Sequence, residues 1–233
     1  MDNEKEILDS INLNDISHEE VGDDHLTSSI ETPMRSDAFD LSDREKIEII
    51  RDHFKAIMVT LGLDTDDESL RGTPYRVAKM YVNEIFSGLN PDNKPVAKKF
   101  ANKYEYGDMV VEKNIQVTSF CEHHFLPFTG KAHVAYISRG KVIGLSKINR
   151  IVDFFSRRPQ VQERLTLQVA NELQKVLETK DVAVFIESKH LCVSMRGIQD
   201  TTSSTITSEF QGAFRKSDIQ RKFIDYIRIK TEM

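Results

Sequence analysis

Hydrophobic residues recur every three to four positions in two segments of the first half of the chain, as expected for helices. A capping box from Ser42 to Glu45 opens the first segment. Pro74 stands in the first turn of the second, and Gly88 is expected to end it. The pattern therefore predicts a pair of helices within residues 42–108.

From about residue 109 the period changes to two residues, which is typical of half-buried strands. The expected elements are then a strand from about residue 109, a strand at 131–138, a helix from about Ser146, a helix from Pro159, strands at 182–187 and 191–195, a strand within 201–214, and a helix that a capping box opens at Ser217 to Gln220. This order predicts an α+β body over residues 109–233, with a mainly antiparallel sheet.

Charge is distributed unevenly along the chain. Residues 1–45 carry 14 acidic and 3 basic side chains, whereas the remainder carries 23 acidic and 29 basic. Residues 1–41 are polar without a hydrophobic period, so we expect a disordered tail there. The mildly basic remainder suits an anionic substrate but lacks the dense Lys/Arg stripe of a nucleic-acid-binding protein. No apolar run approaches the roughly 18 residues that span a bilayer, and no signal peptide is visible, so we expect a cytoplasmic protein.

Both cysteines and three of the seven histidines lie in two short runs, CEHH at 121–124 and HLC at 190–192. Cysteine and histidine are residue types that zinc prefers. A turn could aim Cys121 and His124 at one point, and Cys192 could supply a third ligand. Three such ligands leave the fourth position of zinc for a water, whose pKa falls to about 7. This favours a catalytic zinc over a structural one.

Spacing alone leaves other interpretations open. The two cysteines could form a disulfide, although a reducing compartment disfavours it. A structural zinc would recruit His123 or His190 as a fourth ligand. A lone histidine could also be an ordinary core residue. If residues 190–192 continue a strand, His190 and Cys192 share one face, which places His190 beside the metal as a ligand or as a general acid/base.

Charged residues lie at two expected helix starts, where each has both a structural and a ligand-binding interpretation. Lys147 and Arg150 share a face in the first turn of one helix, where cations oppose the helix dipole unless an anion binds there; a solvated face is the alternative. Glu163 lies beside Gln162 in the first turn of the next helix, where its negative charge would stabilise the helix dipole. Alternatively, its carboxylate could accept two hydrogen bonds from guanine. Two more cations have no partner assignable from the pattern, Arg76 and Arg196.

The longest motifs resemble the GTP cyclohydrolase I family. The resemblance covers roughly residues 45–230 and is carried by TPYRVAKMYVNEIFSGL, CEHHFLPFTGKAHVAYISRGKVIGLSKINRIVDFFSRRPQVQERLTLQVA and HLCVSMRGIQDTTSSTIT. Departures are mild: Ser138 replaces a common proline, and Ser194 lies in a variable stretch. The resemblance implies a T-fold, with an antiparallel sheet, two long helices on one face and an N-terminal helical pair. It also implies a homodecamer with active sites at subunit interfaces.

The same resemblance implies an activity and a cofactor. It implies that GTP and water are converted to 7,8-dihydroneopterin triphosphate and formate, the first step of folate and pterin biosynthesis. It implies zinc as the cofactor, with the ligands Cys121, His124 and Cys192. The implied acid/base residues are His123 and His190.

The resemblance further implies how the nucleotide is held. Glu163 is implied to hold the guanine, with Gln162 beside it. The residues implied to line the triphosphate and ribose are Ser146, Lys147, Arg150, Arg76 and Arg196. No nucleic-acid or membrane partner is expected.

Three rival functions leave parts of the sequence unexplained. A nitrile reductase of the same fold uses a cysteine nucleophile and NADPH without zinc, and the paired CEHH and HLC runs argue against it. A catalytically silent paralogue would not need both cysteines together with the three histidines. A structural-zinc interaction module would leave Lys147, Arg150 and Glu163 without a role.

Overall fold

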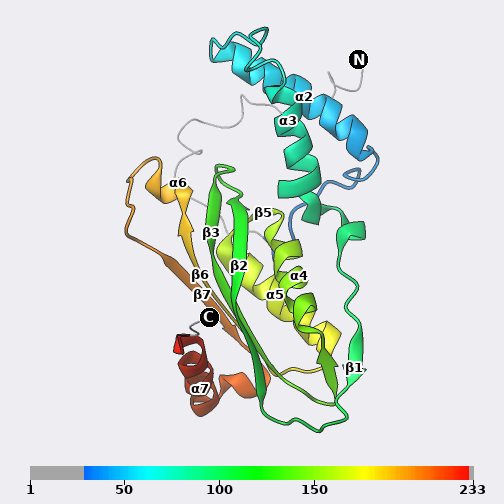
Figure 1. Cartoon of the computed structure of the whole chain (residues 1–233), viewed down its shortest axis with the longest axis vertical. Helices are drawn as coiled ribbons and strands as arrows, with labels where there is room; N and C mark the ends of the chain where they lie inside the picture. The colour runs from blue at the N-terminus through cyan, green and yellow to red at the C-terminus, as the bar shows by residue number, and fades with distance from the viewer. Residues whose placement is uncertain (1–28, 231–233) are drawn as a thin grey trace.

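The structure is a computed structural model that describes residues 29–230 as a mixed α+β molecule (Figure 1). The helices are α2 (Asp43–Thr60), α3 (Thr73–Met80), α4 (Leu145–Ser156), α5 (Gln162–Leu177), α6 (Leu191–Ser194) and α7 (Ser217–Arg228). The strands are β1 (Lys99–Ala101), β2 (Met109–Cys121), β3 (Pro127–Ile137), β4 (Lys141–Ile143), β5 (Pro159–Gln160), β6 (Val182–His190) and β7 (Thr205–Phe210).

Most of the predicted tail of residues 1–41 lies outside the described residues. Its described part, residues 29–41, contains no helix or strand and runs beside α5. There Gln168 Nε2 donates to the Ile30 carbonyl at 2.8 Å, and Arg164 Nε donates to the Ser29 carbonyl at 3.1 Å. Within residues 29–230, no helix is long and apolar enough to cross a membrane.

Helices α2 and α3 begin where local chemistry satisfies their first N–H groups. The Ser42 hydroxyl accepts from the Glu45 N–H at 3.3 Å, and the Glu45 carboxylate accepts from the Ser42 N–H at 2.8 Å. The predicted capping box at this position is therefore confirmed. In α3, Pro74 occupies the first turn, where the absence of its N–H leaves no hydrogen bond unmade. Figure 1 shows both helices at one end of the molecule, beyond the sheet.

The predicted end of the second helix at Gly88 is wrong. The α-helical pattern ends at Met80 and gives way to one π-helical turn, Tyr81–Ile85. Gly88 instead marks a close approach to the end of α4, because its N–H donates to the Arg157 carbonyl at 3.0 Å. A Cβ atom at this position would lie 2.1 Å from the Phe154 carbonyl oxygen, so only glycine fits.

The main sheet has five strands in the order β5-β2-β3-β6-β7. All neighbours are antiparallel except β5, which pairs briefly and in parallel with the end of β2. The β2–β3 register runs from Met109 opposite Ile137 to Phe120 opposite Pro127. A separate antiparallel pair joins β1 and β4. The predicted α+β body with a mainly antiparallel sheet is confirmed.

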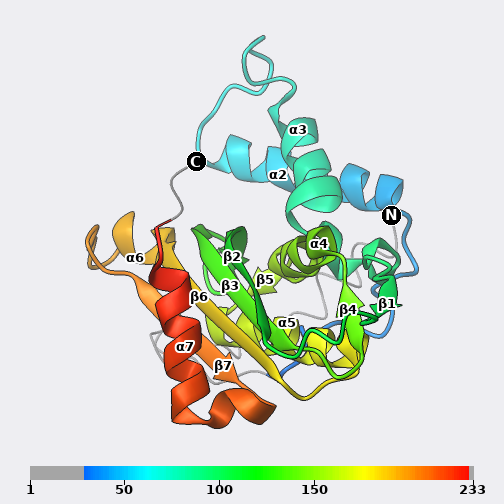
Figure 2. The ribbon, with the colours of Figure 1, turned by 60° about the horizontal axis from the view of Figure 1, so that its bottom comes forward.

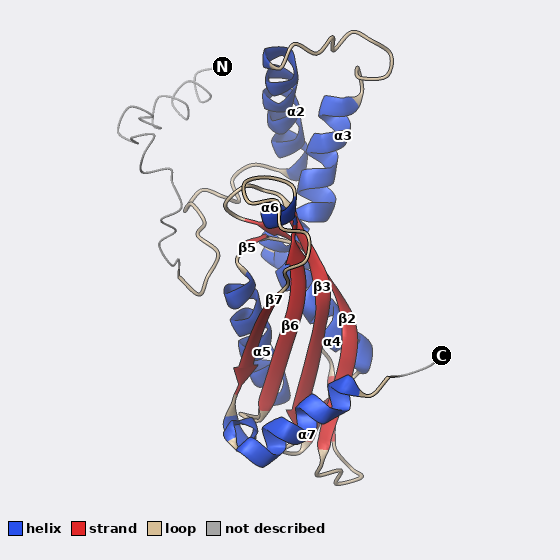
Figure 3. Ribbon diagram, turned by 90° about the vertical axis from the view of Figure 1, so that its left-hand side faces the viewer, coloured by secondary structure: helices blue, strands red, loops and turns tan. Residues whose placement is uncertain are grey.

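Helices α4 and α5 cover one face of this sheet, and α7 lies across the other (Figures 2 and 3). Strand alternation divides the side chains between the two faces. On β3, Val134 and Tyr136 join the core beneath α4 and α5, whereas Ala135 joins the smaller cluster beneath α7. The residues that α5 buries completely in the larger core are Leu165, Val169, Ala170, Leu173 and Leu177.

Three other predicted boundaries are wrong, each for a local reason. Pro159 does not open a helix, because it pairs with the end of β2 and α5 begins at Gln162. Residues 191–195 do not form a strand, since β3 extends only one residue, Pro127, beyond its pairing with His190, and the chain turns into α6. Ser217 does not cap α7, because it is already the first helical residue and its hydroxyl lies past the cap position.

Candidate active site

The CEHH run forms the turn that joins β2 to β3. Strand β2 ends at Cys121, whose N–H donates to the Leu126 carbonyl at 2.8 Å. The Phe125 N–H donates back to the Cys121 carbonyl at 2.9 Å, and Phe125 adopts the left-handed conformation, with φ of 53°. The chain therefore reverses tightly, and His123 and His124 lie on the exposed part of the turn.

The sheet register brings the HLC run to this turn. Strand β3 lies between β2 and β6, and Phe128 near its start is opposite His190 at the end of β6. The two rings stack with their centroids 4.5 Å apart. Cys192 follows in α6, at the same end of the sheet (Figure 1). Two motifs far apart in sequence thus meet at one edge of the fold.

A cavity of about 550 Å³ opens between these two runs and the first turn of α5. Its lining includes the three predicted metal ligands, both predicted acid/base histidines and three residues of the predicted substrate set: Cys121, His124, Cys192, His123, His190, Gln162, Glu163 and Arg196. One cavity therefore gathers eight of the twelve residues that the sequence indicated.

Cys121 and Cys192 are both free thiols, so the alternative of a disulfide between them is wrong. Cys121 is buried and Cys192 is half-buried. Burial, followed by the neighbouring Cys121 thiol, raises the pKa of the Cys192 thiol to about 11. A thiol with so high a pKa is a poor nucleophile, whereas a bound divalent cation would deprotonate it. The pair is better suited to metal ligation than to the cysteine chemistry of the rival reductase.

The side chains of the three predicted ligands share the cavity without converging on one point. His124 Nε2 accepts a hydrogen bond from Arg196 Nη1 at 2.7 Å, and His123 Nδ1 lies 3.5 Å from the Cys121 sulfur. Among residues 29–230, no three His, Cys, Asp or Glu side chains are close enough to hold a metal ion as they stand. Two thiols and an imidazole nevertheless fit the ligand preferences of zinc, provided that His124 turns away from Arg196 toward the sulfur atoms.

Gln162 orients His190 and determines where its proton lies. The Gln162 side-chain nitrogen donates to the carbonyls of Ile186 and Thr205, each at 3.1 Å, so its oxygen faces His190 Nε2 at 2.9 Å. Because this oxygen only accepts, Nε2 carries the proton. Burial lowers the pKa of His190, and the negative charge of Glu163 opposes that shift. The hydrogen bond to Gln162 therefore fixes the orientation of the ring and leaves Nδ1 as the nitrogen that can exchange a proton.

Four residues of the predicted triphosphate set lie outside this cavity. Ser146, Lys147 and Arg150 belong to the start of α4, and Arg76 belongs to α3. Arg76 is exposed, and its guanidinium donates to the Thr73 hydroxyl at 2.8 Å. The folded chain by itself therefore does not bring these four residues to the two thiols.

Sequence reasoning missed an ion pair at the edge of the site. Arg164 donates to both carboxylate oxygens of Glu122, at 2.6 and 3.0 Å, and its side chain is only 2% exposed. A signal was available in the sequence, since Arg164, Gln168 and Glu172 repeat every four residues along one row of α5. A polar row on a helix that is otherwise buried must find partners in the fold.

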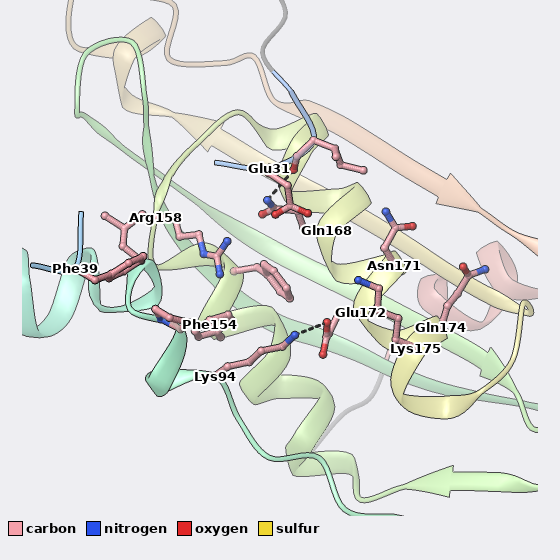
Figure 4. Close-up of a pocket in the computed structure, with 14 residues that line it drawn as sticks. Glu31, Phe39, Lys94, Phe154, Arg158, Gln168, Asn171, Glu172, Gln174 and Lys175 are labelled. Carbon is pink, nitrogen blue, oxygen red and sulfur yellow. Dashed lines mark hydrogen bonds and ion pairs between the residues drawn. The ribbon is translucent and has the colours of Figure 1, made fainter. Parts of the chain in front are cut away.

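A second cavity, of about 540 Å³, lies between α4, α5 and residues 30–39 (Figure 4). Arg158 points into it with its guanidinium stacked on two phenylalanine rings, and Lys94 pairs with Glu172 at 2.7 Å. None of its described lining residues is a cysteine or a histidine. It therefore lacks the thiolate and imidazole ligands of the predicted metal site, and the imidazole that exchanges protons near neutral pH.

Comparison with known proteins shows the family to which the chain belongs. The family model described as GTP cyclohydrolase I matches residues 50–228, which include the β2–β3 turn, the start of α5 and the end of β6. The chain is 58% identical over 214 residues to GTP cyclohydrolase 1 of Flavobacterium johnsoniae, an alignment that covers 92% of this chain and 96% of the relative.

Two further relatives extend the same finding. GTP cyclohydrolase 1 of Aeromonas salmonicida is 53% identical over 196 residues, with 84% of this chain and 89% of the relative covered. GTP cyclohydrolase 1 of Vibrio parahaemolyticus is 53% identical over 192 residues, with 82% and 88% covered. The chain therefore belongs to the GTP cyclohydrolase I family, a family of enzymes.

Proposed function

We propose that this enzyme hydrolyses GTP at C8 of the guanine, releases formate and rearranges the remainder to 7,8-dihydroneopterin triphosphate, the first step of folate and pterin biosynthesis. The observation that carries the proposal is the single cavity that holds two free thiols, three histidines and the carboxylate of Glu163. Family membership supports GTP as the substrate. Water is the second substrate, because formate release is a hydrolysis.

Zinc is the proposed cofactor, and Cys121, His124 and Cys192 would hold it. The two thiols already interact, so the remaining change is for His124 to exchange its hydrogen bond with Arg196 for the metal. Bound there, zinc would supply a water acidic enough to ionise near neutral pH. Arg196, no longer paired with His124, would then be available to an anionic oxygen of the substrate.

His190 and His123 are the proposed acid/base residues. Gln162 and the stacked Phe128 hold His190 in one orientation with the proton on Nε2. A positioned imidazole can transfer a proton to or from the purine, and protonation at N7 makes C8 electrophilic. His123 lies on the exposed part of the turn, beside the Cys121 sulfur, where it can exchange protons with solvent. The later ring opening and closure are also proton transfers, which the same two residues serve.

Glu163 is the proposed anchor for the guanine. Its side chain is exposed at the cavity wall, and it interacts electrostatically with His190. A carboxylate accepts two hydrogen bonds at once, which matches the adjacent N–H groups on the pyrimidine edge of guanine. Holding that edge places the imidazole part of the purine, and with it C8, toward the acid/base and metal-binding residues.

The triphosphate site is proposed to need a second copy of the chain. Ser146, Lys147, Arg150 and Arg76 are suited to phosphate oxygens but lie outside the cavity of their own chain. We infer that neighbouring subunits of a homodecamer complete each site, and we assign the sheet and its two covering helices to the T-fold. The two reduced thiols suit a cytoplasmic enzyme.

One assay tests the proposed function directly. Zinc-loaded protein incubated with GTP should release one formate per GTP consumed and give a product that becomes a fluorescent pterin on oxidation. The absence of formate from a sample with full zinc occupancy would refute the proposal. Consumption of NADPH without formate would instead support the nitrile reductase.

A further inference from the structure

The ion pair between Arg164 and Glu122 is unlike the other ion pairs of the molecule. Its guanidinium makes two parallel hydrogen bonds to the carboxylate, at 2.6 and 3.0 Å, and its Nε donates to the Ser29 carbonyl at 3.1 Å. Among the ion pairs of residues 29–230, this is the only one whose cation is buried, with 2% of the Arg164 side chain exposed. Such a bidentate, desolvated pair fixes both the distance between the two side chains and their relative orientation.

The two partners belong to two different walls of the candidate active site. Glu122 lies between Cys121 and His123 in the β2–β3 turn, and its N–H also donates to the Gln160 carbonyl at 3.0 Å. Arg164 follows Glu163 directly in the first turn of α5. One ion pair therefore joins the turn that bears two of the proposed metal ligands to the helical turn that bears the proposed guanine anchor.

Neither side chain lines the cavity, although Cys121 and His123 on either side of Glu122 do, as does Glu163 directly before Arg164. A role in contacting the substrate or the metal is therefore not supported for either residue. The ion pair can instead fix the distance between the β2–β3 turn and the first turn of α5. Apart from this pair, the β2–β5 pairing holds these two backbone segments together. That separation matters because a displacement of about 1 Å between reacting groups can lower a rate about 100-fold.

We propose that Arg164 and Glu122 are positioning residues that fix the distance between the metal-binding turn and Glu163, so that a guanine held by Glu163 presents C8 to the metal. The inference rests on the proposed function. Loss of the pair removes none of the residues that contact the metal or the substrate, but it changes the distance between the metal-binding turn and Glu163. It also loosens the turn that aims Cys121 and His124, which weakens metal binding.

The variants Arg164→Gln and Glu122→Gln test this role, because each removes one charge and keeps a polar side chain, and Glu122→Gln also keeps the side-chain volume. At saturating zinc, kcat for formate release should fall about 10- to 100-fold, while the KM for GTP changes less than about threefold. The dissociation constant of zinc, measured on metal-free protein by competition with a chelating indicator, should rise about tenfold. Arg164→Lys, which keeps the charge but loses the paired hydrogen bonds, should be intermediate.

The double variant tests whether the two residues act as one unit. If they do, Arg164→Gln combined with Glu122→Gln should lose no more activity than the more affected single variant. Losses that multiply would show two independent effects and would overturn the inference. If Arg164→Gln fails to fold, Glu122→Gln and Arg164→Lys carry the test by the same two measurements.

The ion pair between Lys94 and Glu172 is a matched control. Glu172 lies on the same helix two turns further on, is 10% exposed, and pairs with Lys94 at 2.7 Å across the second cavity (Figure 4). Glu172→Gln should lower the melting temperature without changing kcat or the zinc dissociation constant. An equal loss of kcat in this control, or wild-type kcat and zinc affinity in both Arg164→Gln and Glu122→Gln, would overturn the inference.

Failure of the inference can be told apart from failure of the proposed function. If the wild-type protein with full zinc occupancy releases no formate from GTP, the proposed function is refuted. The zinc affinities and the absorption spectrum of the Co²⁺-substituted variants still test the bridge in that case, because they report the geometry of the metal-binding turn without any reaction. An unchanged Co²⁺ spectrum and zinc affinity in both single variants would then overturn it.

Discussion

The core beneath α4 and α5 shares strands and a helix with the cavity at the end of the same sheet. The core buries apolar side chains, whereas polar and titratable side chains gather in the cavity. In the core, Leu165 and Leu173 of α5 are completely buried against apolar neighbours. In the cavity, the first turn of the same helix exposes Glu163, and the ends of β2 and β6 bring two thiols and three imidazoles together.

This difference separates stability from chemistry within one architecture. Core residues stabilise the fold by about 25 cal/mol for each Å² of apolar surface removed from water. The cavity residues retain ligand capacity that the fold does not use, such as the Cys192 thiol, whose pKa is raised by burial. Groups of this kind contribute little to folding and are retained for binding. Substitutions in the core should therefore change the free energy of unfolding, whereas substitutions in the cavity should change metal binding and activity.

The largest expected effect is the loss of a proposed metal ligand. Cys192→Ser and His124→Ala should each lose zinc and activity together, with at least about a 1000-fold fall in kcat/KM, because the several kcal/mol that a metal contributes to the transition state disappear. Metal analysis and formate release on the same preparation check this. The melting temperature of the metal-free variants should match that of metal-free wild type. Full zinc occupancy in both variants would refute the ligand assignment.

A core substitution should show the opposite pattern. Leu173→Ala removes a completely buried side chain beneath the sheet and should lower the free energy of unfolding by about 2–5 kcal/mol. Denaturant unfolding at a fixed protein concentration measures this, since association of subunits would otherwise shift the midpoint. The folded enzyme should keep its kcat and zinc affinity. A large fall in kcat at full occupancy would show that the core and the cavity are not separable.

The smallest expected effect concerns α4, which buries one side in the core and carries the basic residues outside the cavity. Lys147→Ala should raise the KM for GTP about tenfold, because the loss of one charge-assisted hydrogen bond to phosphate weakens binding by about that factor. Zinc binding should not change. Steady-state kinetics with a zinc analysis of the same sample test it. An unchanged KM would count against a role for Lys147 in holding the triphosphate.

Periodicity was sufficient for the buried face of α5 and insufficient for element boundaries. The positions Leu165, Val169, Leu173 and Leu177 recur at helical spacing, and all four are buried as that spacing predicts. The predicted helix start at Pro159 was wrong because proline is equally acceptable in a short edge strand, and the choice depended on a partner in β2. The end of β6 at His190 likewise depended on where β3 begins.

The candidate site divides in the same way. The residue types in CEHH and HLC indicated a metal ligand set, and the structure places both runs around one cavity. The polar row on α5 indicated that Arg164 needs a partner, but it could not identify Glu122, because the two residues pair only across the fold. The orientation of His190 by Gln162 was missed for the same reason.

The sequence by itself determined which residues can do chemistry and which must be buried, because side-chain type and local period are properties of neighbouring residues in the chain. Only the tertiary structure decided that β3 lies between β2 and β6, and so that Cys121 and His190 share a cavity. It also decided that Arg164 is buried against Glu122. Contacts between segments distant along the chain are set by strand order and packing, which no local pattern encodes.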